Sequence, residues 1–97
     1  MSLLNAKRML DIESAIRQAL APVDLKVTDE SHLHAGHAGA KTGMGHFRVY
    51  VVSENFQEQR MLRRHRLIYD ALGPLMQTDI HALRIDAKTP AEASLSN

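Results

Sequence analysis

The stretch of sequence that decides the fold is HFRVYVV, residues 46–52. Phe47, Val49 and Val51 occupy every second position, so they fall on one face of an extended chain. β-Branched and aromatic side chains dominate the stretch, and these residue types pack well on a pleated surface. We therefore predict a strand here, with its apolar face turned toward a core.

Upstream of this strand, the sequence predicts a helix, another strand and a long loop. Residues 6–21, AKRMLDIESAIRQALA, repeat apolar side chains at three- and four-residue spacing and predict an amphipathic helix. Asn5 is placed to cap its start, and Pro22 prevents its continuation. Residues 25–31, LKVTDES, alternate more weakly and predict a short strand. Residues 32–45 hold four of the five glycines and are expected to form a flexible hairpin loop.

Downstream, helical spacing resumes in residues 59–72, QRMLRRHRLIYDAL. Its apolar side is expected to consist of Met61, Leu62, His65, Ile68, Tyr69 and Leu72. The other side is expected to point its arginines mostly outward: Arg63, Arg64 and Arg66. The pair Gly73-Pro74 stops this helix, and residues 75–79 are expected to form a turn.

The last part of the chain predicts a third strand and a short final helix. Residues 80–87, IHALRIDA, alternate again and place on one face Leu83, Ile85 and Ala87. In TPAEASL, Thr89 can cap a helical turn that has Pro90 at its first position. The predicted order is helix, strand, strand, helix, strand and short helix.

The lengths of the connections predict the topology. The first two strands are joined by a loop and should pair antiparallel, whereas the helix between the second and third allows a right-handed parallel crossover. This arrangement is an α+β fold, in which helices cover a three-stranded mixed sheet. It brings His81 near His46, because parallel strands begin at the same end of a sheet. By strand parity, His81 falls on the same face as Leu83, whereas His46 falls on the face opposite to that of Phe47. We therefore expect the two imidazoles on different faces of the sheet. A histidine of the loop is then the better partner for His81.

Composition narrows the range of functions. With 97 residues and 44% hydrophobic residues, the chain is expected to form a single domain, 1–97, with its core in about 6–92. The net charge of +1 gives no global attraction to a polyanion, and the absence of cysteine removes disulfides and thiolate sites. No secretory signal and no apolar run near the ~18 residues of a membrane span are present. We therefore expect a soluble, cytoplasmic protein without membrane association.

Histidines are the most informative candidate functional residues. Four of the six lie in the Gly/Ala-rich run SHLHAGHAGAKTGMGHF: His46 close to its end, and the cluster of His32, His34 and His37 near its start. Neutral imidazole is a common ligand of transition metals, so the run predicts a metal-binding edge, although loops also collect histidines that only meet water. His81, at the start of a strand, has the same alternatives: a metal ligand, or a hydrogen bond to a neighbouring backbone carbonyl.

The basic cluster RRHR offers a different function. Arg63, Arg64 and Arg66 form either a solvated helix face or a local patch for nucleic-acid backbone. Neither a Ser/His/Asp order, nor a P-loop, nor paired carboxylates at helical spacing stand out. We therefore expect neither an enzyme nor a small-molecule substrate.

Four linked blocks carry a resemblance to a known family. ESHLHAGHAG, GHFRVYVVSENF, LRRHRLIYDAL and IHALRIDAKTPAE resemble the BolA family, in the same order and over about residues 12–92. The resemblance implies an αββαβ domain of class II KH-like type. It also implies a monothiol glutaredoxin as partner, with which the chain would share a 2Fe-2S cluster ligated by the glutaredoxin cysteine, a glutathione thiolate and BolA side chains. Members of the family have also been viewed as transcription regulators linked to cell shape and stress.

The resemblance also assigns candidate ligands. The C-terminal ligand histidine of the family corresponds to His81, and the loop ligand corresponds best to His34, with His37 and His32 as alternatives. The expected function is a non-enzymatic adaptor for glutaredoxin-bound clusters in iron-sulfur trafficking or iron and redox regulation, with no cofactor in the isolated chain. The alternative is a DNA-binding regulator of stress response and cell morphology that acts through Arg63 and its neighbouring arginines.

Overall fold

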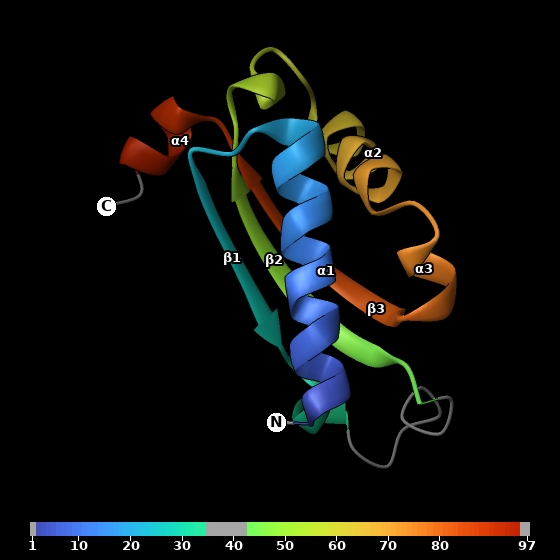
Figure 1. The fold of residues 1–97 in the computed structure, drawn as a ribbon. Helices are drawn as coiled ribbons and strands as arrows, with labels where there is room; N and C mark the ends of the chain where they lie inside the picture. Colours follow the sequence, from blue (N-terminus) through green and yellow to red (C-terminus); the bar gives the residue numbers. More distant parts are fainter. Residues whose placement is uncertain (1, 35–42, 96–97) are drawn as a thin grey trace.

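A computed structural model describes residues 2–34 and 43–95, and for Leu33 and His34 it describes the backbone alone. The elements are, in chain order, α1 (Leu3–Leu20), β1 (Asp24–Asp29), η1 (Ser31–His34), β2 (Gly45–Val52), η3 (Glu54–Phe56), α2 (Met61–Leu72), α3 (Leu75–Thr78), β3 (Ile80–Lys88) and α4 (Pro90–Leu95) (Figure 1). The predicted order of helices and strands is confirmed. The segment expected as a turn before β3 forms the single helical turn α3.

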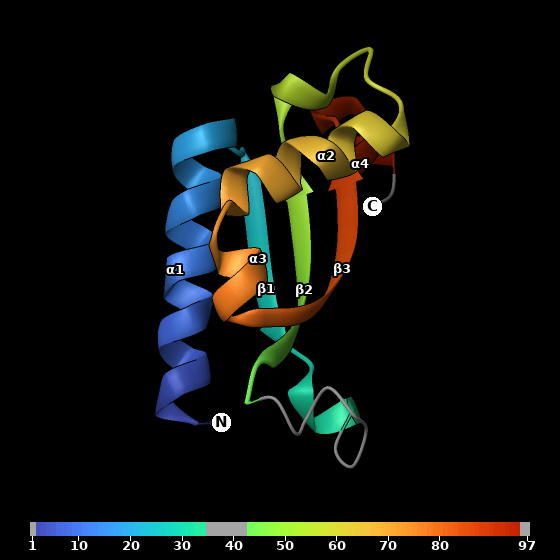
Figure 2. The ribbon, with the colours of Figure 1, turned by 90° about the vertical axis from the view of Figure 1, so that its right-hand side faces the viewer.

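β2 is the central strand of a three-stranded sheet with the order β1-β2-β3 (Figure 2). β1 runs antiparallel to β2, with Val27 opposite Val49, and β3 runs parallel to β2, with Ile85 opposite Val49. The connection between the parallel strands contains α2 and α3, which gives the chain the length that a crossover needs. The predicted mixed sheet and the α+β fold class are therefore confirmed.

One face of the sheet packs against the helices. Phe47, Val49 and Val51 are buried on this face, whereas Arg48, between the first two, is exposed. α1 adds Ile12, Ile16 and Leu20 to the same buried cluster, and α2 adds Ile68 and Leu72. Figure 1 shows α1 in front of the sheet, with α2 beside it. Complete burial contributes about 1.5–3 kcal/mol for each large apolar side chain, so this layer fixes α1 and α2 on the sheet.

The start of α1 differs from the sequence prediction. The helix begins at Leu3, and the Oγ atom of Ser2 accepts a hydrogen bond from the backbone N–H of Asn5 at 3.0 Å. Asn5 lies inside the helix, where its side-chain amide donates to Asp29 Oδ2 at 3.1 Å and to Ser31 Oγ at 3.3 Å. Ser2, and not Asn5, is therefore the cap of the helix. The side chain of Asn5 instead ties α1 to the chain that leaves β1.

The buried side of α2 is also different from the prediction. Met61, Leu62 and Tyr69 are exposed, and Arg64, which was expected to point outward, is only 6% exposed. The guanidinium of Arg64 donates to the carbonyl oxygens of Gln59, at 2.8 Å, and of Ala87, at 3.1 Å. A buried cation is tolerated where such hydrogen bonds and an ion pair replace its water. Apolar spacing therefore identified Ile68 and Leu72 correctly, but it missed the burial of Arg64.

The carboxylate of Glu92 completes the partners of Arg64. Nη1 of Arg64 donates to Glu92 Oε1 at 2.6 Å. The same carboxylate oxygen accepts from the backbone N–H of Thr89 at 2.8 Å, and Thr89 Oγ1 accepts from the N–H of Glu92 at 3.2 Å. This reciprocal pair is a capping box, and it confirms the predicted role of Thr89 at the start of α4. Arg64, with the backbone of Thr89, lowers the pKa of the Glu92 carboxyl from its usual 4.5 to about 2.

We predict that Glu92→Gln makes the stability of the protein less sensitive to acid. Because the folded state lowers the pKa of Glu92, this carboxylate stabilises the fold above pH 4.5, and its contribution is lost as the pH falls from 4.5 toward about 2. Urea unfolding across this range should show wild type losing more stability than the variant. Glu58→Gln, which changes an exposed glutamate, should follow wild type. Parallel curves for wild type and Glu92→Gln would contradict the prediction.

Candidate functional site

A β-bulge shapes the start of β3. Along most of the two parallel strands the pairing is regular, but Gly45 lies opposite Ile80 and the next residue, His46, lies opposite Ala82. His81 is therefore one extra residue on β3. A bulge of this kind bends the strand and redirects the side chain at the extra position.

The bulge brings the rings of His46 and His81 together. Their centroids lie 5.1 Å apart, with the ring planes tilted by 47°. The expectation that these two imidazoles lie on different faces of the sheet is wrong, because the extra residue breaks the parity that groups His81 with Leu83. The one trace of the bulge in the sequence is Ile80, an apolar and buried residue out of phase with Leu83.

The two histidines differ in their access to solvent. His46 is 6% exposed, and both of its ring nitrogens are shielded from solvent. His81 is exposed at the end of the sheet. An exposed imidazole can accept a ligand or a partner, while a buried ring beside it limits the positions that it can adopt. The pair thus combines one accessible imidazole with one buried, packed imidazole.

The backbone of His46 joins this pair to the start of the loop. Its carbonyl oxygen accepts from the N–H of Glu30 at 2.8 Å, and its own N–H donates to Ser31 Oγ at 3.1 Å. η1 begins at Ser31, so the histidine-rich segment leaves the sheet directly beside His46.

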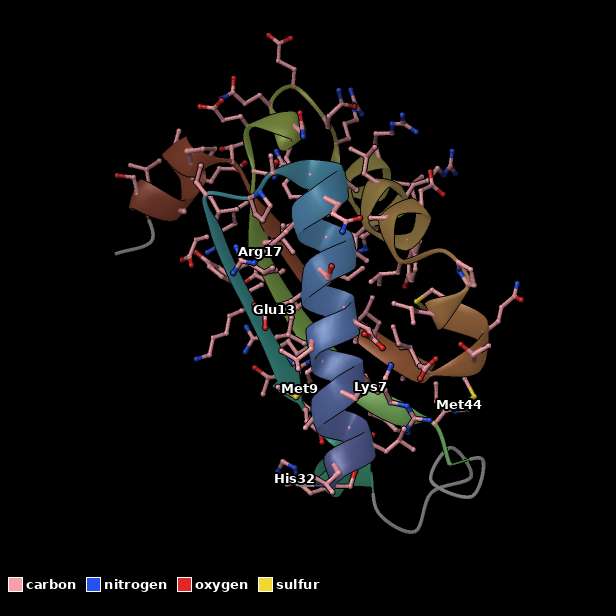
Figure 3. The ribbon with its side chains drawn as sticks, viewed as in Figure 1. Lys7, Met9, Glu13, Arg17, His32 and Met44 are labelled. Carbon is pink, nitrogen blue, oxygen red and sulfur yellow. The ribbon has the colours of Figure 1, made fainter. Side chains whose placement is uncertain are left out.

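The predicted loop ligands are described to different extents. His32 is exposed in η1, near the start of α1 (Figure 3). The backbone of His34 belongs to η1, and His37 lies outside the described residues. Within residues 2–34 and 43–95, no group of three or more histidines, aspartates or glutamates is arranged to hold a metal ion. The described residues therefore supply a histidine pair, not a complete metal site.

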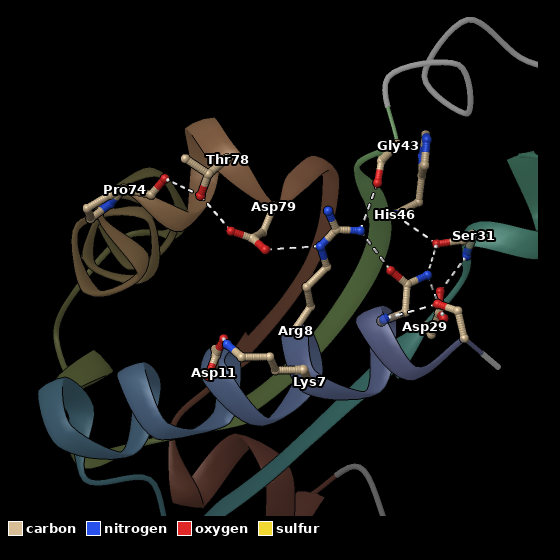
Figure 4. A network of polar contacts seen from close by, with 12 residues as sticks. Lys7, Arg8, Asp11, Asp29, Ser31, Gly43, His46, Pro74, Thr78 and Asp79 are labelled. Carbon is tan, nitrogen blue, oxygen red and sulfur yellow. Dashed lines mark hydrogen bonds and ion pairs between the residues drawn. The ribbon is translucent and has the colours of Figure 1, made fainter.

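A network of polar side chains lies beside His46 (Figure 4). Its centre is Arg8, which is 7% exposed and was not predicted as a functional residue. The sequence contains a signal for it, since Arg8 stands four residues before Ile12 on the buried stripe of α1. Arg8 pairs with Asp79 at 3.0 Å. The hydroxyl of Thr78, together with Arg8, holds the pKa of the Asp79 carboxyl below its usual range.

The predicted arginine cluster is divided by the structure. Arg63 and Arg66 are exposed on α2, whereas Arg64 is buried in the network of Glu92. Only the first two can meet a polyanion from solvent. Arg60, just before α2, is also exposed and extends this surface.

Comparison with known proteins identifies the family. The family profile described as BolA-like protein matches residues 16–92. The chain belongs to the BolA-like family. The resemblance to the BolA family is therefore confirmed over most of the chain.

Three relatives show how far the similarity extends. BolA-like protein 1 from Mus musculus is 47% identical, over 84% of this chain and 60% of its own length. DNA-binding transcriptional regulator BolA from Escherichia coli (strain K12) is 42% identical, over 84% of this chain and 74% of its own length. The solved BolA domain of SufE1 from Arabidopsis thaliana gives a TM-score of 0.76 at 42% identity, over 88% of this chain and 94% of that domain. The chain spans only 24% of the length of the whole A. thaliana SufE-like protein 1.

The names of these BolA-like relatives bear on the remaining expectations. They describe BolA-like proteins and a transcriptional regulator, and none of these names contains a catalytic activity. SufE-like protein 1 is named as chloroplastic/mitochondrial, so a cytoplasmic location of this chain stays a prediction. Among the helices within residues 2–34 and 43–95, none is long and apolar enough to cross a membrane.

Gly45→Ala should destabilise the start of β2. A Cβ atom at Gly45 would collide with the buried ring of Phe47, opposite the bulge of β3. Overpacking of this kind costs about 1–3 kcal/mol of stability, and we expect that loss in urea unfolding.

The Phe47→Leu background supplies the control for this prediction. If the collision with the ring is the cause, the cost of Gly45→Ala should shrink in that background, which a double-mutant cycle measures. An equal cost in both backgrounds would rule out the collision.

Proposed function

We propose that this BolA-like chain is a non-enzymatic adaptor that contributes histidine ligands to a 2Fe-2S cluster held jointly with a monothiol glutaredoxin and glutathione. The observation that supports the proposal best is the position of His81. It is exposed at the end of the sheet, in ring contact with His46 and close to the start of the histidine-rich loop. An adaptor needs such an accessible ligand on a rigid element.

The residues of the chain fit a shared cluster better than a cluster held by the chain alone. Without cysteine, the chain offers no thiolate, and its described residues contain no group of three side chains that could hold a metal ion. Iron-sulfur clusters need soft ligands, and imidazoles can replace only some of them. A partner must therefore supply the sulfur ligands, as the family resemblance implies. When bound, the cluster would supply one-electron redox chemistry and iron and sulfide for transfer.

Each histidine has a distinct part in this proposal. His81 would donate a ring nitrogen, and the packed ring of His46 would limit its rotation. The second ligand would come from the loop, where His34 is preferred and His37 and His32 are the alternatives. Limiting the rotation of a ligand before binding reduces the entropy that binding must remove.

His81→Ala should remove the contribution of this chain to the shared cluster. The chain is mixed with a monothiol glutaredoxin, glutathione, iron and sulfide, and visible absorption and circular dichroism are recorded. With wild type, we expect a spectrum that differs from that of glutaredoxin alone, and His81→Ala should lower the affinity for the loaded partner at least ~10-fold. Separate alanine variants at the three loop histidines should identify the second ligand.

His65→Ala is the matched control, because His65 lies on α2, outside the site. It should preserve the wild-type spectrum. A spectrum equal to that of glutaredoxin alone for both wild type and His81→Ala would refute the ligand role.

A second candidate function is DNA binding. The E. coli relative is named as a DNA-binding transcriptional regulator, and Arg60, Arg63 and Arg66 are exposed in or beside α2 of this chain. Arg64 is excluded from such a surface, since its guanidinium is buried.

The double variant Arg63→Ala/Arg66→Ala tests this second function. If these arginines neutralise phosphates, the variant should weaken binding to duplex DNA and reduce the slope of log affinity against log salt by about 2. Lys26→Ala, an exposed cation on β1, should leave both unchanged. Affinity that is insensitive to salt and to the double variant would eliminate this function.

A further inference from the structure

Arg8 ties together the two chain segments that lead into His46 and His81. Its Nε donates to Asp79 Oδ2 at 3.0 Å, and its Nη1 donates to the carbonyl oxygen of Gly43 at 2.8 Å (Figure 4). Gly43 lies three residues before His46, and Asp79 lies two residues before His81. One side chain from α1 therefore bridges the last turn before β2 and the last residue before β3.

A backbone hydrogen bond closes the bridge into a ring. The N–H of Gly45 donates to the carbonyl oxygen of Asp79 at 3.0 Å. Gly43 and Gly45 on one segment are thus held to Asp79 on the other by two independent routes. The bulge at His81 follows directly after this closed ring, so the ring fixes the point from which the strand bends.

The same side chain reaches the start of the histidine-rich loop. Nη1 of Arg8 also donates to Asn5 Oδ1 at 3.0 Å, and Asn5 in turn donates to Ser31 Oγ. That hydroxyl oxygen accepts the backbone N–H of His46. Arg8 is therefore connected to all three described segments that border the site: η1, the start of β2 and the start of β3.

Only an arginine fits these partners. The planar guanidinium presents several N–H donors in fixed directions, whereas a lysine ammonium is a single compact charge on a flexible stem. Lysine at this position would keep the attraction to Asp79, but it could not hold the Asp79 carboxylate and the Gly43 carbonyl in one rigid geometry. The charge of Arg8 and its bridging geometry can therefore be separated by substitution.

We propose that Arg8 is the positioning residue of the histidine site: its hydrogen bonds to Gly43 and Asp79 set the approach of the His46 and His81 rings. The importance of Arg8 for cluster sharing rests on the proposed function. The effect of Arg8 on the positions of the two rings concerns the free protein alone. Ligand constellations must be held within about 0.5 Å by the residues behind them, and Arg8 occupies that supporting place.

The test compares Arg8→Gln and Arg8→Lys with a matched pair at the other buried arginine. Arg64 is equally buried and bonds to two backbone carbonyls, but it lies where β3 ends. The readout is the nuclear Overhauser effect between ring protons of His46 and His81 in the free protein. The ring centroids lie 5.1 Å apart, and the effect falls with the sixth power of the distance between protons, so separating ring protons that lie within ~5 Å of one another by about 1 Å more weakens it about threefold or more.

We expect both Arg8 variants to lose intensity by that factor or more, and Arg64→Gln and Arg64→Lys to keep the wild-type value. Thermal unfolding of all four variants separates general destabilisation, which both arginine sites should show, from the local effect. Wild-type intensity in Arg8→Gln or in Arg8→Lys overturns the proposal, since the bridge or its geometry would then be unnecessary. Should Arg8→Gln fail to fold, the Arg8→Lys and Arg64→Lys pair decides alone.

A second measurement links the inference to the proposed function. The cluster spectrum with glutaredoxin should weaken in Arg8→Lys and persist in Arg64→Lys. If wild type itself yields no shared spectrum, the proposed function fails, while the ring measurement still decides the role of Arg8. If the spectrum of Arg8→Lys equals that of wild type although the ring contact is lost, the claimed importance for cluster sharing is overturned.

Discussion

The pairing of β2 on both of its sides is the constraint on which the rest of this structure depends. β2 holds β1 antiparallel and β3 parallel, so the starts of β2 and β3 meet at one end of the sheet. η1, Gly43 and the first turns of α1 lie at that end. The opposite end receives α4. Each end is secured by a buried arginine, Arg8 beside the histidines and Arg64 beside α4.

A single irregularity in the pairing of β2 and β3 gives the histidine end its chemistry. A regular ladder would leave His81 in phase with the core-facing residues of β3. The extra residue turns it instead toward His46, and the closed ring of hydrogen bonds around Asp79 comes immediately before the bend. The site thus combines an irregular strand with a polar network that fixes where the irregularity begins. Its exposed ring can meet another molecule while its support stays inside the protein.

Much of the fold can be predicted from the sequence, because period and connection length leave physical traces. The alternation around Val49, the helical spacing of residues 6–21 and the helix-containing crossover all predict what is observed. The contact between the histidines could not be predicted, since one inserted residue leaves almost no trace in the alternation. The burial of Arg64 was missed for another reason: its partners, Ala87 and Glu92, are distant in sequence. The approach of His81 to His46 was predicted correctly, but not the face on which their rings meet.

In the part of the chain that the structure describes, the sheet has three strands, so β1 and β3 are its edge strands. Edge strands present backbone groups on which another extended chain can add, which is a route to aggregation. Both strands carry charged side chains along their length, Lys26 on β1 and Arg84 and Asp86 on β3. Charge at such positions disfavours the stacking of identical chains edge to edge. The same small sheet that exposes a histidine at its end thus carries, along its sides, charges that oppose templated self-assembly.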